Sequence, residues 1–492
     1  MITFILSLTL LLLGYLLYSR LVVRIFGPKP ERSTPAYSMR DGVDYLPMKG
    51  PRNSMIQLLN IAGVGPIFGP VLGALYGPVA FLWIVFGAIF AGAVHDYLTG
   101  MISIRNGGAH LPDLAGKYLG KAFRHLVNFF SVLLLLLVGT VFVSAPSTLI
   151  HNILGGWGSV AVIAAVIYLY YVLATLLPID KIIGRVYPYL GMLLVFSAVG
   201  VGLTLLLSGA PIPELTLSNL HPEGLPVYPL LFLTISCGAL SGFHATQSPI
   251  ISRTTQNESQ GRQIFYGMMI AEAVIAMIWA AAAMSLFYGR DLSELIATVG
   301  PAGVVREVSM TLLGTVGGTL AILGVVVLPI TSGDTAFRSA RMILGDYFGI
   351  LQRKMANRLW IALPLFFISF GLTFIDFSML WRYFSWANQS TAMLALWVAA
   401  VYLARAGKFH WIATVPATFI TSVCFTYILN APIGFGLDLN LSYAIGGVAT
   451  AIVLGGFLWT HILNTPTWDT PLDEPVDADS KRPDEGLFHG GD

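Results

Sequence analysis

Long apolar segments alternate with short polar segments along almost the whole chain. Each apolar segment is close to the ~20 residues that an α-helix needs to cross the hydrocarbon core of a bilayer. A further stretch, Gly289 to Met310, carries several charges and is predicted to lie at the surface as a helix. The pattern predicts an all-α polytopic membrane protein with about 13 transmembrane helices, at residues 2–23, 55–76, 79–104, 126–154, 160–177, 187–208, 227–247, 264–288, 311–333, 359–377, 380–404, 411–430 and 441–463.

Composition supports the membrane class and excludes others. Of the 492 residues, 56% are apolar and 11% are charged, whereas average soluble proteins carry ~25% charged residues. The net charge of +2 gives no reason to expect nucleic acid as a partner. The two cysteines, Cys237 and Cys424, lie inside apolar segments, so neither a disulfide nor a metal site is predicted, and no cofactor is expected. Because the sequence has no P-loop, HExxH or nucleophile-elbow motif, ATP-driven transport and an intramembrane enzyme are both disfavoured.

The distribution of Lys and Arg predicts the orientation of the chain. If the N-terminus is outside and the segments alternate, all but Arg290, Arg306 and Arg382 of the 27 basic residues fall on the inner side. Such a bias is the positive-inside rule, and adding or removing one early helix would invert it. We therefore expect the N-terminus outside and the C-terminus in the cytoplasm.

The second apolar segment contains an unusual run, Gly63-Val64-Gly65-Pro66-Ile67-Phe68-Gly69-Pro70. Prolines remove backbone donors and glycines admit unusual φ values, so a continuous helix is disfavoured. Unpaired backbone groups at membrane depth are tolerated only where protein or a watery cavity satisfies them. The run therefore indicates either a helix broken around a binding site, as in secondary transporters, or a proline-kinked helix with glycine packing.

A second break is predicted in the seventh segment, where small and polar residues run from Cys237 to Gln247 with Pro249 just beyond. This segment lies five segments after the first break and runs through the membrane in the opposite direction, as an inverted repeat of five plus five helices requires. The predicted organisation is a peripheral first helix (1–25), a cytoplasmic loop (26–54), two repeats (55–208 and 227–405), two peripheral helices (410–463) and a flexible acidic tail (464–492).

Residues at the two breaks are the candidates for binding substrate. We expect substrate between the breaks, where freed backbone groups and polar side chains converge. For His244, and for Asn388 and Gln389, hydrogen bonds that only hold helices together are the alternative. The predicted substrate-binding residues are Gly65, Pro66, Gly69, Ser241, Gly242, His244, Gln247, Asn388 and Gln389.

Two further groups are candidates for the coupling ion, H⁺ or Na⁺. Ala62 and Gly63 with Thr331, Ser332 and Asp334 would offer oxygen ligands to a monovalent cation, unless Asp334 only pairs with Arg338 or Arg341 at a helix end.

The second group consists of candidates for carrying a proton, namely Glu272, Asp96 and His95. A carboxylate at the depth of Glu272 costs a few kcal/mol unless it is paired or protonated. For Asp96, pairing with Arg105 or another inner cation is the favoured interpretation.

Several of these segments are similar to those of the carbon-starvation protein A family. They are DGVDYLP at 41–47, IAGVGP at 61–66 with GPVL at 69–72, AGAVHD at 91–96 and SCGALSGFHA at 236–245, with weaker matches at 334–341 and 387–389. The resemblance implies a peptide or pyruvate importer of the bacterial inner (plasma) membrane with the LeuT-type five-plus-five fold. His95 stands where longer members tend to carry Gln, Ser385-Trp386 precedes Ala387, and the chain is shorter than those members.

The sequence thus predicts an ion-coupled secondary importer of a short peptide or small organic anion such as pyruvate. A passive channel is the main alternative, and an intramembrane enzyme is a weaker one. The expected partners are the lipid bilayer, the substrate and a monovalent cation; the sequence does not indicate an oligomeric state.

Overall fold

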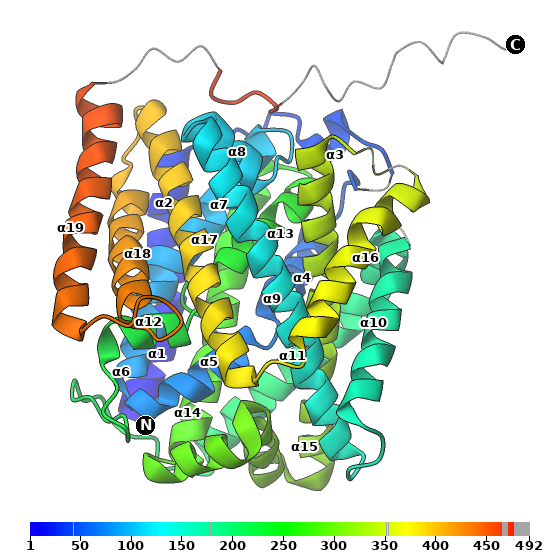
Figure 1. Ribbon diagram of the computed structural model, residues 1–492, viewed down its shortest axis with the longest axis vertical. Helices are drawn as coiled ribbons and strands as arrows, with labels where there is room; N and C mark the ends of the chain where they lie inside the picture. The colour runs from blue at the N-terminus through cyan, green and yellow to red at the C-terminus, as the bar shows by residue number, and fades with distance from the viewer. Residues whose placement is uncertain (43, 177–178, 351, 353, 465–470, 477–492) are drawn as a thin grey trace, which may run out of the picture.

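The computed structural model describes the whole chain except residues 43, 177–178, 351, 353, 465–470 and 477–492. The described part is a bundle of mostly upright helices (Figure 1). Its β-structure is limited to one isolated bridge between Met48 and Thr255. The all-α prediction is therefore confirmed.

Nine helical runs of the described residues are long and apolar enough to cross a membrane. They are α1–α2 (Ile2–Phe26), α6–α7 (Val79–Arg105), α9 (Lys121–Ile153), the run ending in α14 (Glu258–Leu286), α15 (Arg290–Phe348), α16 (Met355–Leu372), α17 (Phe377–Arg405), α18 (Trp411–Asn430) and the run beginning with α19 (Leu439–Leu463). The remaining predicted spans correspond to the bent pair α4–α5 (Gly50–Ala62, Gly65–Gly73), to α10 (Val160–Leu176) and α11 (Ile179–Leu207), and to the pair α12–α13 (Val227–Thr234, Gly242–Ser252). Two short helices, α3 (Pro35–Ser38) and α8 (Leu111–Tyr118), lie at one end of the bundle (Figure 1).

The first predicted break is present and is shorter than the Gly/Pro run. Helix α4 ends at Ala62, α5 begins at Gly65, and the two are bent by 47°. Gly63 makes the turn with φ +30°, a conformation that residues with a side chain rarely adopt. A Cβ at this position would also lie 2.2 Å from the Phe142 ring, so a larger residue does not fit. Pro66 falls in the first turn of α5, where a missing N–H costs nothing, and so starts the second half-helix.

The second predicted break is also present. Helix α12 ends at Thr234 and α13 begins at Gly242, with Gly238 at φ +89° between them. Helix α13 continues through Pro249 to Ser252, beyond the predicted end at Gln247. Both half-helices, α5 and α13, therefore begin at a break inside the bundle.

The prediction of a surface helix at 289–310 is partly wrong. Two glycines with non-helical backbone, Gly300 (φ +69°) and Gly314 (φ +66°), divide α15 into two short helices and one long helix. Val304, Val305 and Val308 of the second short helix are buried, so it packs onto the bundle and does not lie free on the surface. The long third part corresponds to the predicted ninth span.

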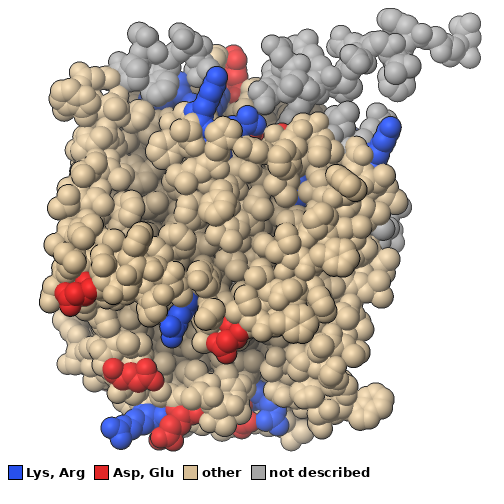
Figure 2. Space-filling model, viewed as in Figure 1, with Lys and Arg blue, Asp and Glu red and all other residues tan. Residues whose placement is uncertain are grey.

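Exposure and charge agree with a membrane bundle. In the most apolar window of the first and last runs, 28% and 22% of residues are buried, compared with 89% in α17. The first run and α19 are therefore peripheral, and α17 is central. The middle of the visible face is almost free of charged side chains, which gather towards the two ends (Figure 2). We call the end that carries α3 and α8 the inner face, because the charge pattern predicts it to be cytoplasmic.

Candidate functional site

The two breaks lie directly against each other. A Cβ on Gly65 would lie 2.3 Å from the Cys237 sulfur, and a Cβ on Gly69 would lie 3.0 Å from the carbonyl oxygen of Thr234. A side chain is therefore excluded at Gly65 by the Cys237 side chain and is crowded at Gly69 by the backbone of the other break. Pro66 is part of the same contact, because its Cα lies 3.8 Å from the position of a Cβ on Gly238.

We expect Gly65→Ala to destabilise the fold by about 1–3 kcal/mol, because the added methyl group overpacks a rigid contact. Gly447→Ala in α19 is the matched control, since no atom lies within 4 Å of its Cβ position. The melting temperature of the purified protein in detergent measures both. An unchanged melting temperature for Gly65→Ala would mean that the breaks are not packed as described.

Helix α17 satisfies the backbone of the second break. The Asn388 side-chain oxygen accepts hydrogen bonds from the backbone N–H of Phe243 (2.8 Å) and the Ser241 hydroxyl (3.1 Å). The Gln389 amide donates to the carbonyl oxygens of Phe232 (2.9 Å) and Leu240 (3.1 Å). These contacts favour the interpretation that Asn388 and Gln389 hold the break open, since most of their polar groups are already used.

His244, in the first turn of α13, lies between two buried carboxylates. Its Nδ1 lies 2.8 Å from Asp96 Oδ2, and its Nε2 lies 3.3 Å from Glu272 Oε2. His95 Nδ1 lies 2.8 Å from the other oxygen of Asp96, and all four side chains are fully buried. The interpretation that Asp96 pairs with Arg105 or another inner cation is wrong, because Asp96 contacts His95 and His244 while Arg105 pairs with Glu258.

This group, which we call the buried acid–histidine cluster (His95, Asp96, His244 and Glu272), can hold and move a proton. Two full negative charges around a neutral imidazole would be costly away from water, so the cluster needs at least one shared proton. Neither His244 Nε2 nor the Glu272 carboxylate has a well-aligned hydrogen-bond partner among the described residues. A proton, a water molecule or a substrate group could therefore be accommodated at this point.

Cys237 adds a thiol to the same place. The thiol, an imidazole nitrogen of His244 and a Glu272 oxygen lie within 4.8 Å of one another, a spacing at which three side chains could share a metal ion. No metal was expected from the sequence, because the two cysteines do not have the spacing typical of a metal site.

The predicted cation group lies beside α4. The Ser332 hydroxyl donates to the carbonyl oxygen of Leu59 at 2.7 Å, just before Ala62 and Gly63, and Thr331 donates to the Leu328 carbonyl within its own helix. Asp334 lies 3.9 Å from Arg338, and neither carboxylate oxygen has a hydrogen-bond partner among the described residues.

Sequence reasoning missed two amides in α4, Gln57 and Asn60. Both are buried, and none of their side-chain polar atoms has a hydrogen-bond partner among the described residues. Residues three apart share one face of a helix, and this face leads to the first break. Gln247 in α13 is similar, since its amide contacts Thr246 at 3.2 Å while its oxygen has no hydrogen-bond partner in the described chain. The sequence feature that could have identified them is the presence of two amides, Gln57 and Asn60, in the apolar segment that precedes Gly63.

A cavity of about 400 Å³ opens on the outer side of the breaks. Phe68 and Phe377 line it, and their ring centroids lie 6.3 Å apart. Trp381 stacks on Phe377 at 5.8 Å and approaches Gly69 in the first half-helix. This aromatic group therefore connects the lining of the cavity with the first half-helix. The cavity is lined by Phe68, Ser144, Ala145, Ser147, Thr148, Val160, Ala161, Ala164, Val299, Gly300, Pro301, Ala302, Phe370, Thr373, Phe374, Ile375, Phe377 and Leu380.

Comparison with known families gives a match across most of the chain. The family described as "Carbon starvation protein CstA" matches residues 1–203, 157–294 and 290–427. An uncharacterized membrane protein of Haemophilus influenzae is 48% identical over 58% of this chain and 91% of its own length. The peptide transporter CstA of Bacillus subtilis is 25% identical over 83% of this chain and 86% of its own length. The pyruvate/proton symporter BtsT of Escherichia coli is 28% identical over 56% of this chain and 48% of its own length.

Solved structures identify the fold. The transporter MhsT, solved in complex with L-phenylalanine, superposes with a TM-score of 0.54 at 14% identity, covering 81% of this chain and 98% of its own. A manganese transporter of Eremococcus coleocola superposes with a TM-score of 0.56 at 13% identity, covering 83% of this chain and 93% of its own. Both are LeuT-fold transporters, so the predicted LeuT-like architecture with two broken helices is confirmed.

Proposed function

Because the chain belongs to the carbon starvation protein CstA family, we propose that it is a secondary active importer of a small organic anion or short peptide, coupled to protons. Its relatives support the general class: the chain is a membrane-spanning secondary transporter of a bacterial cell membrane. Relatives that are named for their activity are transporters, which agrees with the expectation that the chain is not an enzyme.

A carboxylate-bearing substrate is supported by the two half-helices. Helices α5 and α13 both begin at the breaks, and the N-terminal end of a helix carries partial positive charge and free N–H groups. Pyruvate and peptides share a carboxylate, so the same recognition would serve both. Gln57 and Asn60 in α4 and Gln247 in α13 carry side-chain polar atoms that have no hydrogen-bond partner among the described residues. We therefore add Gln57 and Asn60 to the candidate substrate residues.

Proton coupling is supported above all by one observation, the position of His244 between Asp96 and Glu272 next to the second break. A substrate carboxylate arriving at the break would change the charge beside this cluster and so change its proton occupancy. Import then follows if the loaded cluster opens inward and loses its proton to the cytoplasm. Alternating access would move one repeat against the other around the breaks.

Sodium is the second candidate for the coupling ion. It is favoured by Ser332 against the Leu59 carbonyl and by the carboxylate of Asp334, which together offer oxygen ligands beside Ala62 and Gly63. The two candidate sites share no residue and can be tested separately.

Uptake into proteoliposomes tests the proposal. We expect labelled pyruvate, or labelled di- and tripeptides, to accumulate above equilibrium when the outer solution is more acidic, and not when both sides have equal pH. A sodium gradient at equal pH tests the alternative ion. Counterflow distinguishes a carrier from a passive channel, because only a carrier shows trans-stimulation. If none of these substrates accumulates with either gradient, the proposal is wrong.

A further inference from the structure

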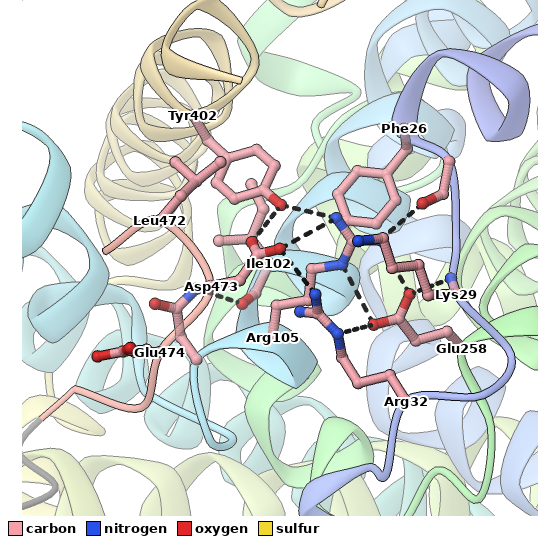
Figure 3. Close-up of polar contacts among 12 residues, drawn as sticks. Phe26, Lys29, Arg32, Ile102, Arg105, Glu258, Tyr402, Leu472, Asp473 and Glu474 are labelled. Atoms are coloured by element: carbon pink, nitrogen blue, oxygen red, sulfur yellow. Dashed lines mark hydrogen bonds and ion pairs between the residues drawn. The ribbon is translucent and has the colours of Figure 1, made fainter. Parts of the chain in front are cut away.

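Residues 471–476, near the C-terminal end, are held against the inner face. The prediction of a flexible tail from residue 464 is wrong for this segment, which we call the clasp. Asp473 lies 3.0 Å from Arg32 and accepts a hydrogen bond from the Tyr402 hydroxyl at 2.8 Å (Figure 3). Leu472 and Val476 pack against the hydrophobic core of the bundle.

The backbone of the clasp is bound as well as its side chains. Lys117 donates to the carbonyl oxygens of Glu474 (2.9 Å) and Leu472 (3.3 Å). The Tyr118 hydroxyl donates to the Leu472 carbonyl at 2.7 Å. Both donors lie in α8, so the clasp docks on a surface formed by α8 together with the inner ends of α7 and α17.

The surface beneath the clasp is a buried ionic network centred on Arg105 (Figure 3). Arg105 donates to Glu258 at 3.0 Å and 3.2 Å, to the Tyr402 hydroxyl at 3.0 Å, and to the carbonyl oxygen of Gly27 at 2.7 Å. Its guanidinium also lies 4.2 Å from the centre of the Phe26 ring. The network therefore joins the loop after the first helix to both predicted repeats, since Arg105 belongs to the first repeat and Glu258 and Tyr402 belong to the second.

Charge explains why an acidic residue docks here. Arg32 and Arg105 both lie within 4 Å of Glu258, which would leave two positive charges against one negative charge. Asp473 lies 3.6 Å from Arg105 as well as beside Arg32, and so supplies the second negative charge. A neutral segment of the same shape would leave the pair of guanidinium groups without that charge.

We propose that the clasp is an inner lock: Asp473 docks on the Arg32–Arg105–Tyr402 site and holds the two repeats together at the inner face. The proposal rests on the proposed alternating-access function, in which the inner ends of the repeats must separate. Release of the clasp then precedes inward opening, and the occupant of the docking site is this chain's own segment.

Asp473 docks as an ionised carboxylate, and the low pKa of this group keeps the lock stable across physiological pH. Burial raises the pKa of Asp473, but the hydrogen bond from Tyr402 and the charges of Arg105 and Arg32 outweigh it, so the pKa lies below its ordinary value of 3.8. A depressed pKa stabilises docking above that ordinary value and loses the stabilisation only as the pH falls through the docked value. The clasp is therefore not the pH sensor of the carrier, and the pH dependence of transport is expected to survive its removal.

Accessibility of the inner half-helix tests the lock. Ser252, the last residue of α13, is buried, and so are the native Cys237 and Cys424. In a Ser252→Cys background in inside-out vesicles, we expect Asp473→Asn to raise the rate of modification at position 252 by an impermeant maleimide about ten-fold. Glu474→Gln is the matched control, because it removes a neighbouring negative charge whose side chain is exposed. Mass spectrometry assigns the label to position 252.

The proposal is overturned if the labelling rate at position 252 is the same in the Ser252→Cys protein, with Asp473→Asn added and with Glu474→Gln added. An equal rise in both variants, or a slower rate with Asp473→Asn, would also overturn it. A chain ending at Asn464 gives a second measurement if Asp473→Asn is unstable. We expect it to be labelled fast, and a peptide of residues 465–492 to restore slow labelling, whereas the same peptide with Asp473→Asn does not; equal effects of the two peptides would also overturn the lock. Because labelling uses neither substrate nor gradient, its failure is distinguishable from a failure of transport.

Discussion

Replacing His244 by alanine is expected to lower gradient-driven uptake by at least ~100-fold. The imidazole is the only described group within ion-pair distance of both Asp96 and Glu272. Its removal leaves the buried Glu272 carboxylate without its partner and leaves Asp96 with His95 alone. Breaking a buried ion pair in this way costs about 3–5 kcal/mol. Initial rates of labelled pyruvate or peptide uptake in proteoliposomes under a pH gradient measure the effect.

The controls separate chemistry from folding. His125→Ala removes a histidine from α9 whose ring is exposed, and uptake should change less than two-fold, that is by under ~0.4 kcal/mol. The double variant His244→Ala with Glu272→Gln removes the stranded charge, so it should recover melting temperature without recovering accumulation. Wild-type accumulation by the single variant would show that the buried acid–histidine cluster does not take part in transport.

The positions of both breaks could be predicted from the sequence because their causes are local. Gly63 and Gly238 adopt positive φ, and Pro66 lies where a helix starts, so each residue marks its own conformation. The lengths of the breaks were less predictable. Pro70 and Pro249 both lie inside helices in the structure, because neighbouring groups in the bundle can accommodate the missing hydrogen bond.

The partners of the buried charged residues could not be predicted in the same way. Asp96 and His244 are 148 positions apart, and nothing along the chain distinguishes this partner from Arg105, which lies on the same helix. The choice is made by packing, which turns Asp96 into the bundle and places Arg105 at the inner face. The clasp was missed for a related reason. Its composition is that of a flexible tail, and the groups that hold it, among them Arg32, Arg105 and Lys117, lie far away in the sequence.

Glu272→Gln is expected to separate exchange from accumulation, and this effect is the largest expected from a conservative change. Glutamine keeps the shape of the side chain and a polar contact to His244, so substrate should still bind and counterflow should continue at a rate within about three-fold of wild type. Glutamine cannot carry a proton, so uptake driven by a pH gradient should fall to the equilibrium level. Comparing counterflow with gradient-driven uptake in the same proteoliposomes measures both quantities. Retained counterflow together with lost accumulation would place the coupling proton at the 3.3 Å contact between His244 and Glu272.

Glu307→Gln is the control for losing a carboxylate, because Glu307 pairs with Arg306 outside the buried cluster and both side chains are half-exposed. It should accumulate substrate as the wild type does. If Glu272→Gln also accumulates substrate under a pH gradient, the coupling proton does not pass through this carboxylate. The matching variant Asp334→Asn under a sodium gradient then becomes decisive, since Asp334 is the remaining candidate beside the first break whose carboxylate has no hydrogen-bond partner among the described residues. Loss of sodium-driven accumulation in that variant, with counterflow retained, would move the coupling site from the second break to the first while leaving the substrate position between them unchanged.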